Sequence, residues 1–163
     1  LVLQEPFLYH GTIASNIQMY QAISQDDIIE AARFVDAAPF IEKLPNGYQQ
    51  LVTERGSSFS TGQRQLLAFA RTMASQPKIL ILDEATANID SETEQTVQHS
   101  LEKMRKGRTT IAIAHRLSTI QDADCIYVLD KGKIIESGSH EELLALKGTY
   151  HRMYELQAGQ LAR

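Results

Sequence analysis

The feature that most constrains the fold is an apolar run ending in two carboxylates, Ile79-Leu80-Ile81-Leu82-Asp83-Glu84. A continuous run of this kind is typical of a strand in a sheet that helices cover on both faces. A second run spans Thr109 to Ala114, and a shorter strand signal lies at Leu1 to Leu3. Helical patterns separate these runs, and strands that alternate with helices imply right-handed crossovers. The sequence therefore predicts an α/β fold with a mostly parallel sheet.

Four segments carry the signal of a helix start, a serine followed three residues later by a side chain that can close a capping box. These serines are Ser24, Ser60, Ser91 and Ser139. Pro77 is expected to end the second helix. Residues 11–78 show no clear strand and are expected to form a helical insertion beside the sheet.

The C-terminal part of the sequence predicts a hairpin and two final helices. The strands Ile126 to Leu129 and Lys133 to Glu136 are separated by Asp130-Lys131-Gly132, which is typical of a hairpin at a sheet edge. Cys125 cannot form an internal disulfide, because it is the only cysteine. It precedes an apolar strand, so we expect a buried small hydrophobic residue in a reducing compartment.

Composition limits the classes of partner. The chain has 163 residues with 43% hydrophobic and 22% charged residues, which fits one globular domain. Its net charge of −4 provides no basic field, so nucleic acid is not expected as a partner. No apolar stretch approaches the roughly 20 residues of a membrane-spanning helix. Because Leu1 is neither a start methionine nor part of a signal peptide, the chain is expected to begin within a longer protein.

Polar residues follow each of the three parallel strands. Asp83 and Glu84 end the central run, His115 follows the second run, and Gln4 follows the first. Ligands of open α/β sheets bind outside the carboxyl ends of the strands, where these groups would meet a metal and a phosphate. Each residue also has an ordinary structural reading as a solvated or hydrogen-bonded strand end. The combination of all four predicts a phosphate site.

A helix start supplies a further candidate. Ser60-Thr61-Gly62-Gln63 opens a helix whose first amides could hold an anion, although the segment could equally be only a well-capped helix. Asp90 precedes another helix and would by default be its N-cap.

In their order and spacing these segments resemble the motifs of ATP-binding cassette (ABC) proteins. Phe59 to Gln65 resembles the signature motif, Ile79 to Glu84 the Walker B strand, and Gln4 with Phe7-Leu8 the Q-loop. Ala87 to Asp90 resembles the D-loop, and Ala114 to Ser118 the switch-histidine loop. The resemblance covers essentially the whole chain. It implies a partial RecA-like P-loop NTPase core formed by residues 1–10 and 79–163, with a helical subdomain at 11–78.

The resemblance also implies a role for each candidate residue. Glu84 would be the general base and His115 would contact the γ-phosphate of ATP. Asp83 would hold Mg²⁺, and Gln4 would sense this metal and couple to transmembrane helices. Three residues, Ser60, Gly62 and Gln63, would complete the ATP site of a second nucleotide-binding domain, and Asp90 would act across that dimer.

Finer features resemble exporters, whose nucleotide-binding domains are fused to a transmembrane domain and lie at the cytoplasmic face of the membrane. These features are Gly11 to Ile17, Thr53 to Gly56 and Ala114 to Thr119. The expected activity is ATP hydrolysis coupled to export of a drug, lipid or peptide. The alternatives are a non-catalytic interaction module of the same fold and a DNA-repair ATPase, and the latter is disfavoured because residues 11–78 lack heptads.

Two departures from the family pattern have consequences. The signature has Thr61 where the family usually has glycine, and a β-carbon there would crowd the face presented to the partner's nucleotide. The site that this chain completes would then be impaired, whereas the site that uses its own Glu84 and His115 keeps these residues. Such a difference between two sites resembles heterodimeric exporters and favours a heterodimer. The chain also contains no Gly-x-x-x-x-Gly-Lys-Ser/Thr segment, whose amides and lysine anchor the phosphates.

We therefore predict that the 163-residue chain alone neither binds ATP tightly nor hydrolyses it, because the main phosphate anchor lies outside it. Isothermal titration calorimetry with MgATP should show no saturable heat in the micromolar range. Micromolar binding by the isolated chain would contradict the prediction.

Overall fold

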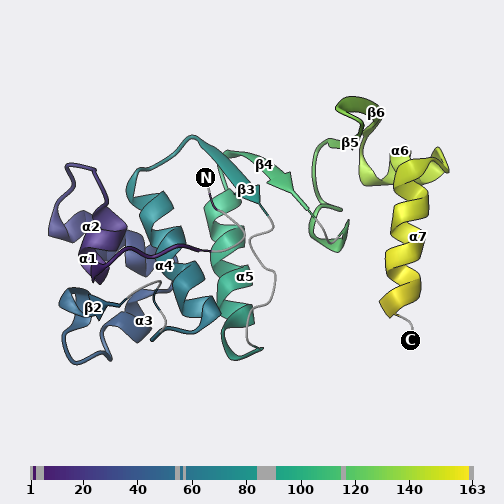
Figure 1. Cartoon of the computed structure of the whole chain (residues 1–163). Coiled ribbons are helices and arrows are strands. Elements are labelled where there is room, and N and C mark those ends of the chain that lie inside the picture. The colour runs from purple at the N-terminus through teal and green to yellow at the C-terminus, as the bar shows by residue number, and fades with distance from the viewer. Residues whose placement is uncertain are drawn as a thin grey trace. The chain divides into compact units, whose positions relative to one another are not determined.

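The computed structural model describes residues 2, 6–53, 56, 58–83, 91–114 and 117–161 (Figure 1). They form two compact units, Leu1–Ile113 and Ala114–Arg163. The first unit contains β1 (Gly11–Thr12), α1 (Ile13–Gln18), α2 (Gln25–Phe34), α3 (Ala38–Ile41), the 3₁₀ turn η1 (Gly47–Gln49), β2 (Leu51–Val52), α4 (Thr61–Ala74), β3 (Ile79–Asp83), α5 (Ser91–Arg105) and β4 (Thr109–Ile113). The second contains the 3₁₀ turn η3 (Leu117–Thr119), β5 (Ile126–Asp130), β6 (Lys133–Gly138), α6 (His140–Ala145) and α7 (Thr149–Leu161).

A short parallel sheet organises the first unit. β3 pairs with β4 in parallel, with Ile81 opposite Ile111, and Val2 forms a parallel bridge to Leu82 on the same strand. The Val2 amide donates to the Ile81 carbonyl at 2.8 Å. The predicted mostly parallel sheet is confirmed, because the β3–β4 pairing and the bridge at Val2 are both parallel.

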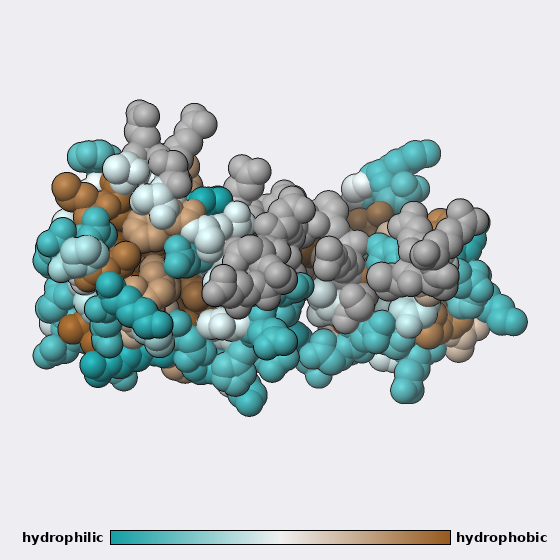
Figure 2. Space-filling model, turned by 90° about the horizontal axis from the view of Figure 1, so that it is seen from below, coloured by the Kyte–Doolittle hydropathy of each residue, from teal (hydrophilic) through white to brown (hydrophobic). Residues whose placement is uncertain are grey.

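The central helix of this unit is α4, which packs against α1, α2 and α5 (Figure 1). Its apolar side chains recur at helical spacing and are buried, among them Leu66, Phe69 and Ala70. They join Leu80 and Leu82 of β3 in one hydrophobic core. Figure 2 shows apolar residues (brown) gathered between polar ones (teal) in the part that carries these helices. The helical block therefore shares its core with the covered face of the sheet.

Three of the four predicted helix starts form capping boxes. Ser24, Ser60 and Ser139 each accept a hydrogen bond from the backbone three residues later, and that residue's side chain accepts one in return. The fourth predicted helix start is also present, because α5 begins at Ser91. Asp90, the residue before it, lies outside the described residues. The α4 helix ends at Ala74, ahead of Pro77 as predicted.

Residues 11–78 do contain strands, contrary to the prediction. β1 and β2 are two residues long and pair antiparallel, with Gly11 opposite Val52. A two-residue strand has no readable alternation, and its partner lies about 40 residues away in the sequence, so no local pattern announces it. The helices α1 and α3 were also missed, because they are too short to show a clear helical periodicity in the sequence. A capping box formed by Thr12 and Ser15 does mark the start of α1.

The two faces of the sheet differ in the described structure. Leu80 is fully buried, whereas Ile79 and Ile111 expose 58% and 54% of their surface. Successive side chains of a strand point to opposite faces, so one face packs on the helices and the other is open in the described part. The expectation of a sheet covered on both faces is therefore not met within these residues.

The second unit is a hairpin with two helices. β5 and β6 pair antiparallel, and Lys131 and Gly132 between them both have positive φ, as a two-residue type I′ turn requires. The hairpin and the two final helices agree with the prediction, but in the described structure β5 and β6 form a two-stranded sheet of their own and not the edge of the β3–β4 sheet. Its core contains Leu117, Ile126, Val128, Leu143 and Tyr150.

Cys125 corrects another expectation, because it is exposed rather than buried. Ile126 and Val128 face the core of the second unit, and Cys125 and Tyr127 fall on the outer face by alternation. A hydrogen bond with Cys125 and their electrostatic interaction raise the pKa of the Tyr127 hydroxyl. In the described parts of the chain, no helix is both long and apolar enough to cross a membrane.

A buried serine joins α5 to the end of α2. The Ser100 hydroxyl has no exposed surface and donates to the Val35 carbonyl at 2.7 Å. Next to it, the Lys103 ammonium forms a salt bridge with Asp36 at 3.2 Å. The Ser100 hydroxyl also lies 2.8 Å from the Thr96 carbonyl of its own helix, and it is thus a buried polar contact between α5 and the residue that follows α2.

We predict that Ser100→Ala lowers the free energy of unfolding by about 1–3 kcal/mol, because it removes the donor from a carbonyl at a buried interface. The matched control is Ser75→Ala, which removes an exposed hydroxyl bond to the Thr72 carbonyl and should cost less than about 0.5 kcal/mol. Urea denaturation of both variants measures the difference. Equal losses would contradict the proposed importance of burial.

Candidate functional site

The carboxyl edge of the parallel sheet is the described centre of the candidate site. The register aligns the end of β3 with the end of β4, with Asp83 opposite Ile113. Val2 is aligned with Leu82, and the Asp83 amide donates to the Val2 carbonyl at 2.9 Å. The ends of β3 and β4 and the bridging residue Val2 therefore lie along one edge, with the partly buried Asp83 on the middle strand.

Four of the predicted site residues, Gln4, Glu84, Asp90 and His115, lie outside the described residues. In the sequence Glu84 follows Asp83 directly, while Gln4 and His115 come two residues after Val2 and Ile113. The described members of the predicted site are Asp83, Ser60, Gly62 and Gln63. They belong to two elements, the end of β3 and the start of α4.

The start of α4 is a capping box. The Ser60 hydroxyl accepts from the Gln63 amide at 3.2 Å, and the Gln63 side-chain oxygen accepts from the Ser60 amide at 3.1 Å. Gly62 is buried in the first turn between them. The interpretation of this segment as a well-capped helix start is thus confirmed. Its interpretation as an anion-binding site stays a prediction, supported by the partial positive charge of a helix N-terminus.

Arg64 is a residue that the sequence reasoning missed. Its guanidinium donates to the Phe59 carbonyl at 2.7 Å and to the Thr61 hydroxyl at 3.0 Å. The arginine therefore spans the helix start and fixes the Thr61 side chain. Its position three residues after Thr61 on a helix was the available signal, because such residues share a face.

The loop before α4 is packed against the same arginine. Gly56 has a φ of +66°, and a β-carbon there would lie 2.7 Å from a methyl group of Leu8 and 3.3 Å from the Arg64 side chain. Only glycine fits this position without displacement of its neighbours. Arg64 thus links the described part of the segment 53–56 to the signature-like helix start.

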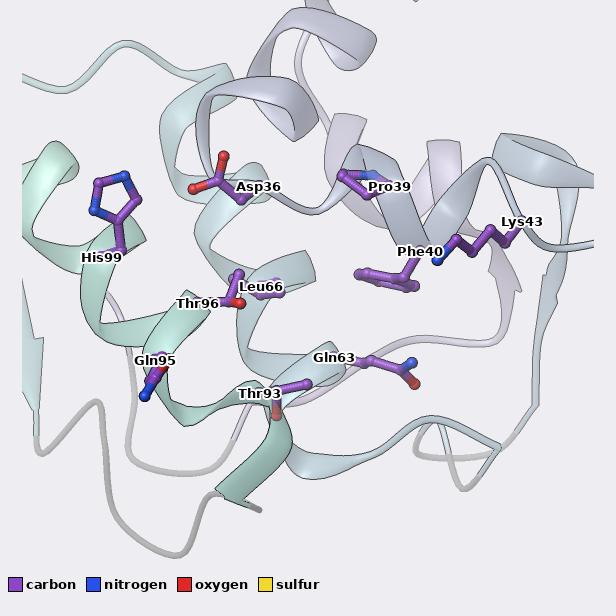
Figure 3. A pocket seen from close by; sticks show the side chains of 10 residues that line it. All are labelled: Asp36, Pro39, Phe40, Lys43, Gln63, Leu66, Thr93, Gln95, Thr96 and His99. Carbon is purple, nitrogen blue, oxygen red and sulfur yellow. The ribbon is translucent and has the colours of Figure 1, made fainter.

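A cavity of about 540 Å³ lies beside α4 (Figure 3). Its lining comes from the end of α2 through α3 to the following turn, from α4 and from α5: Asp36, Pro39, Phe40, Lys43, Gln63, Leu66, Thr93, Gln95, Thr96 and His99. Gln63 is the only predicted site residue in this lining. The Asp36 carboxylate is neutralised by Lys103, so the cavity does not extend the acidic edge of the sheet. It is a separate feature of the helical block.

Among the described residues, no three His, Cys, Asp or Glu side chains gather as a metal site. Asp83 is the described acid at the carboxyl edge, and no salt bridge joins it to another described residue. A carboxylate of this kind is a ligand type that Mg²⁺ prefers. Asp83 is thus compatible with the predicted metal role, which the described residues leave as a prediction.

Comparison with known proteins identifies the family. The ABC transporter family model matches residues 1–87. This chain belongs to the ABC transporter family. It is 79% identical over 162 residues to the putative ABC transporter ATP-binding protein exp8 of Streptococcus pneumoniae, covering 99% of the chain and 28% of that protein. It is 55% identical over 161 residues to YheH of Bacillus subtilis, described as a probable multidrug resistance ABC transporter ATP-binding/permease protein, covering 98% and 24%.

A solved structure supports the ABC fold independently. The chain matches a bacterial Atm1-family ABC exporter with ATP bound, with a TM-score of 0.85 and 44% identity over 96% of the chain and 28% of that structure. The predicted RecA-like fold, in the partial form of an ABC ATPase, is therefore confirmed. The chain spans about a quarter of the length of these relatives.

Proposed function

We propose that this chain forms most of the nucleotide-binding domain of an ABC exporter, in which ATP binding and hydrolysis drive transport across a membrane. The observation that carries the proposal is the parallel register that brings the ends of β3 and β4 and the bridging residue Val2 to one edge, with Asp83 on the middle strand. The relatives support it, since they are ABC transporter proteins and one matched structure is an exporter with ATP bound. In this proposal residues 1–10 and 79–163 belong to the catalytic core and 11–78 to a helical subdomain.

The chemistry assigned to the sheet edge is phosphoryl transfer from ATP to water. Glu84 accepts a proton from the attacking water, and His115 donates a hydrogen bond to the γ-phosphate. Asp83 holds Mg²⁺ directly or through water, with Gln4 as a further ligand. When bound, Mg²⁺ supplies positive charge against the phosphate oxygens. In such a reaction the protein mainly positions groups and stabilises charge.

The start of α4 is assigned to the ATP that a second nucleotide-binding domain binds. Ser60, Gly62 and Gln63 contribute the positive end of α4, whose macrodipole favours an anion. Asp90 acts across the same interface. A second nucleotide-binding domain is therefore the proposed partner, and each of the two ATP sites combines residues from both domains.

Membrane attachment is proposed through the same polypeptide. The chain covers 24% of YheH, whose name combines ATP-binding and permease functions. A transmembrane domain in the remaining length would place this domain at the cytoplasmic face of the membrane. Neither a non-catalytic module nor a DNA-repair ATPase is favoured by the relatives, which are transporters.

Thr61 supports a heterodimer within this proposal. Its side chain is partly buried and its hydroxyl accepts from Arg64, so the threonine is fixed at the helix start. A fixed β-carbon and hydroxyl leave less room for a nucleotide than glycine would. The site completed by this chain is then impaired, whereas the site that uses its own Glu84 and His115 is competent.

The central test is Glu84→Gln in the complete exporter. Removing a general base should lower kcat for ATP hydrolysis by about 10²- to 10⁴-fold while ATP binding is retained. Glu102→Gln on α5 is the matched control, because it makes the same change at an exposed glutamate and should leave kcat unchanged. Hydrolysis at the normal rate by the Glu84→Gln exporter would refute the proposal.

The heterodimer has its own test. Affinity purification of the tagged complete exporter from its native cell should recover a second, different ABC subunit in equal amount. Nucleotide-occlusion measurements should then show one site turning over faster than the other. Recovery of a homodimer with two equally active sites would contradict the role given to Thr61.

A further inference from the structure

The turn that enters α4 is attached to the hydrophobic core. Phe59 is 6% exposed, and its ring packs edge-on against Phe40 with 6.4 Å between the ring centroids. The Phe59 amide donates to the Gly56 carbonyl at 3.0 Å, which closes the turn before the helix. Both the side chain and the backbone of Phe59 are therefore restrained, and its carbonyl is an acceptor in a fixed place.

Arg64 connects this acceptor to the first residue of the helix. Its guanidinium donates through Nη1 to the Phe59 carbonyl and through Nη2 to the Thr61 hydroxyl. The two nitrogens belong to one planar group, so the two acceptors are held in a fixed relation to each other. The backbone restrains the arginine as well, because its amide donates to the Ser60 carbonyl at 3.0 Å. Arg64 thus holds the residue before Ser60 and the residue after it.

The capping box leaves this task to the arginine. Its two hydrogen bonds join Ser60 and Gln63, and neither of them involves the Thr61 side chain. A threonine in a helix can choose between two χ1 rotamers, and the bond from Arg64 favours one of them. The direction of the Thr61 hydroxyl at this helix start therefore depends on Arg64.

We propose that Arg64 is a positioning residue for the start of α4, and this inference rests on the proposed function, in which Ser60, Gly62 and Gln63 face the ATP of a second nucleotide-binding domain. The guanidinium holds the first turn in the shape that meets the nucleotide. Without it the Phe59 carbonyl loses a charged donor, and the turn shifts to find another one. Closure of the two domains around ATP then needs more nucleotide, because binding must first restore the turn.

The test follows closure of the complete exporter with MgAMP-PNP, an ATP analogue that resists hydrolysis. Energy transfer between fluorophores on the two nucleotide-binding domains gives the analogue concentration at which half of the exporter is closed. Arg64→Met keeps a long side chain and removes both donors, so this concentration should rise about tenfold. Arg33→Met is the matched control, because it makes the same change at an exposed arginine of α2 whose salt bridge with Glu42 is 3.9 Å long. Its closing curve should not shift.

Two further readouts separate positioning from charge and from stability. Arg64→Lys keeps the positive charge but replaces the planar fork by a single nitrogen, so it should still raise the half-closing concentration about fivefold. At saturating analogue the Arg64→Met exporter should close to the normal extent. A normal curve with Arg64→Lys would mean that charge alone acts and would overturn the inference. A reduced extent of closure at an unchanged half-closing concentration would show a loss of folded protein only, and would overturn it too.

Ser60→Ala separates the inference from the proposed function. This variant removes the capping hydroxyl of the helix start that faces ATP, so it should also raise the half-closing concentration. A shift with Ser60→Ala and none with Arg64→Met would overturn the inference alone. No shift with either variant, or no closure of the unmodified exporter, would refute the role of the helix start in the proposed function, and the inference with it.

Discussion

The arrangement of the site depends on the backbone hydrogen bonds that pair β3 with its two parallel neighbours. Parallel pairing makes adjacent strands end on the same side of the sheet, so groups that follow them in the sequence share one edge. In this chain the pairing aligns Asp83 with Ile113 and Leu82 with Val2. An antiparallel neighbour would send its following residues to the opposite edge. The strand direction thus gives physical meaning to the short polar segments after each strand.

The helical block is tied together by hydrogen bonds that two arginine side chains donate. The Arg71 guanidinium donates to the Asn16 carbonyl and side-chain oxygen and to the Phe7 carbonyl. Burial lowers the pKa of Arg71, yet a guanidinium stays charged. The three acceptors therefore offset the free-energy cost of removing this cation from water. Arg64 does the same at the other end of α4 for the loop around Phe59. The two arginines therefore connect α4 to the chain before it and keep the helix start in place.

The sequence predicted what depends on local pattern. Apolar runs gave β3 and β4, and capping serines gave α2, α4 and α6, because burial and capping are recorded in neighbouring residues. The pattern could not reveal β1 and β2, whose pairing depends on residues distant in sequence, nor the exposure of Cys125, which depends on which strand face is outward. In the site, Asp83 and the Ser60 helix start were predicted, whereas Arg64 was missed because its partners become visible only once the loop is folded. The hydrogen bond from the Leu117 amide to the Gln157 side chain spans 40 residues and has no local signature.

The proposed ATP site requires that groups from separate strand ends and one helix start meet at a single nucleotide. The most direct measurement is an electron cryomicroscopy structure of the complete Glu84→Gln exporter with MgATP. We expect ATP with its γ-phosphate and metal within hydrogen-bonding or ligand distance, about 2–3 Å, of Asp83, Gln4 and His115 of one subunit, and with Ser60 of the other subunit facing the nucleotide. Phosphates bound well away from the carboxyl ends of β3 and β4 would contradict it.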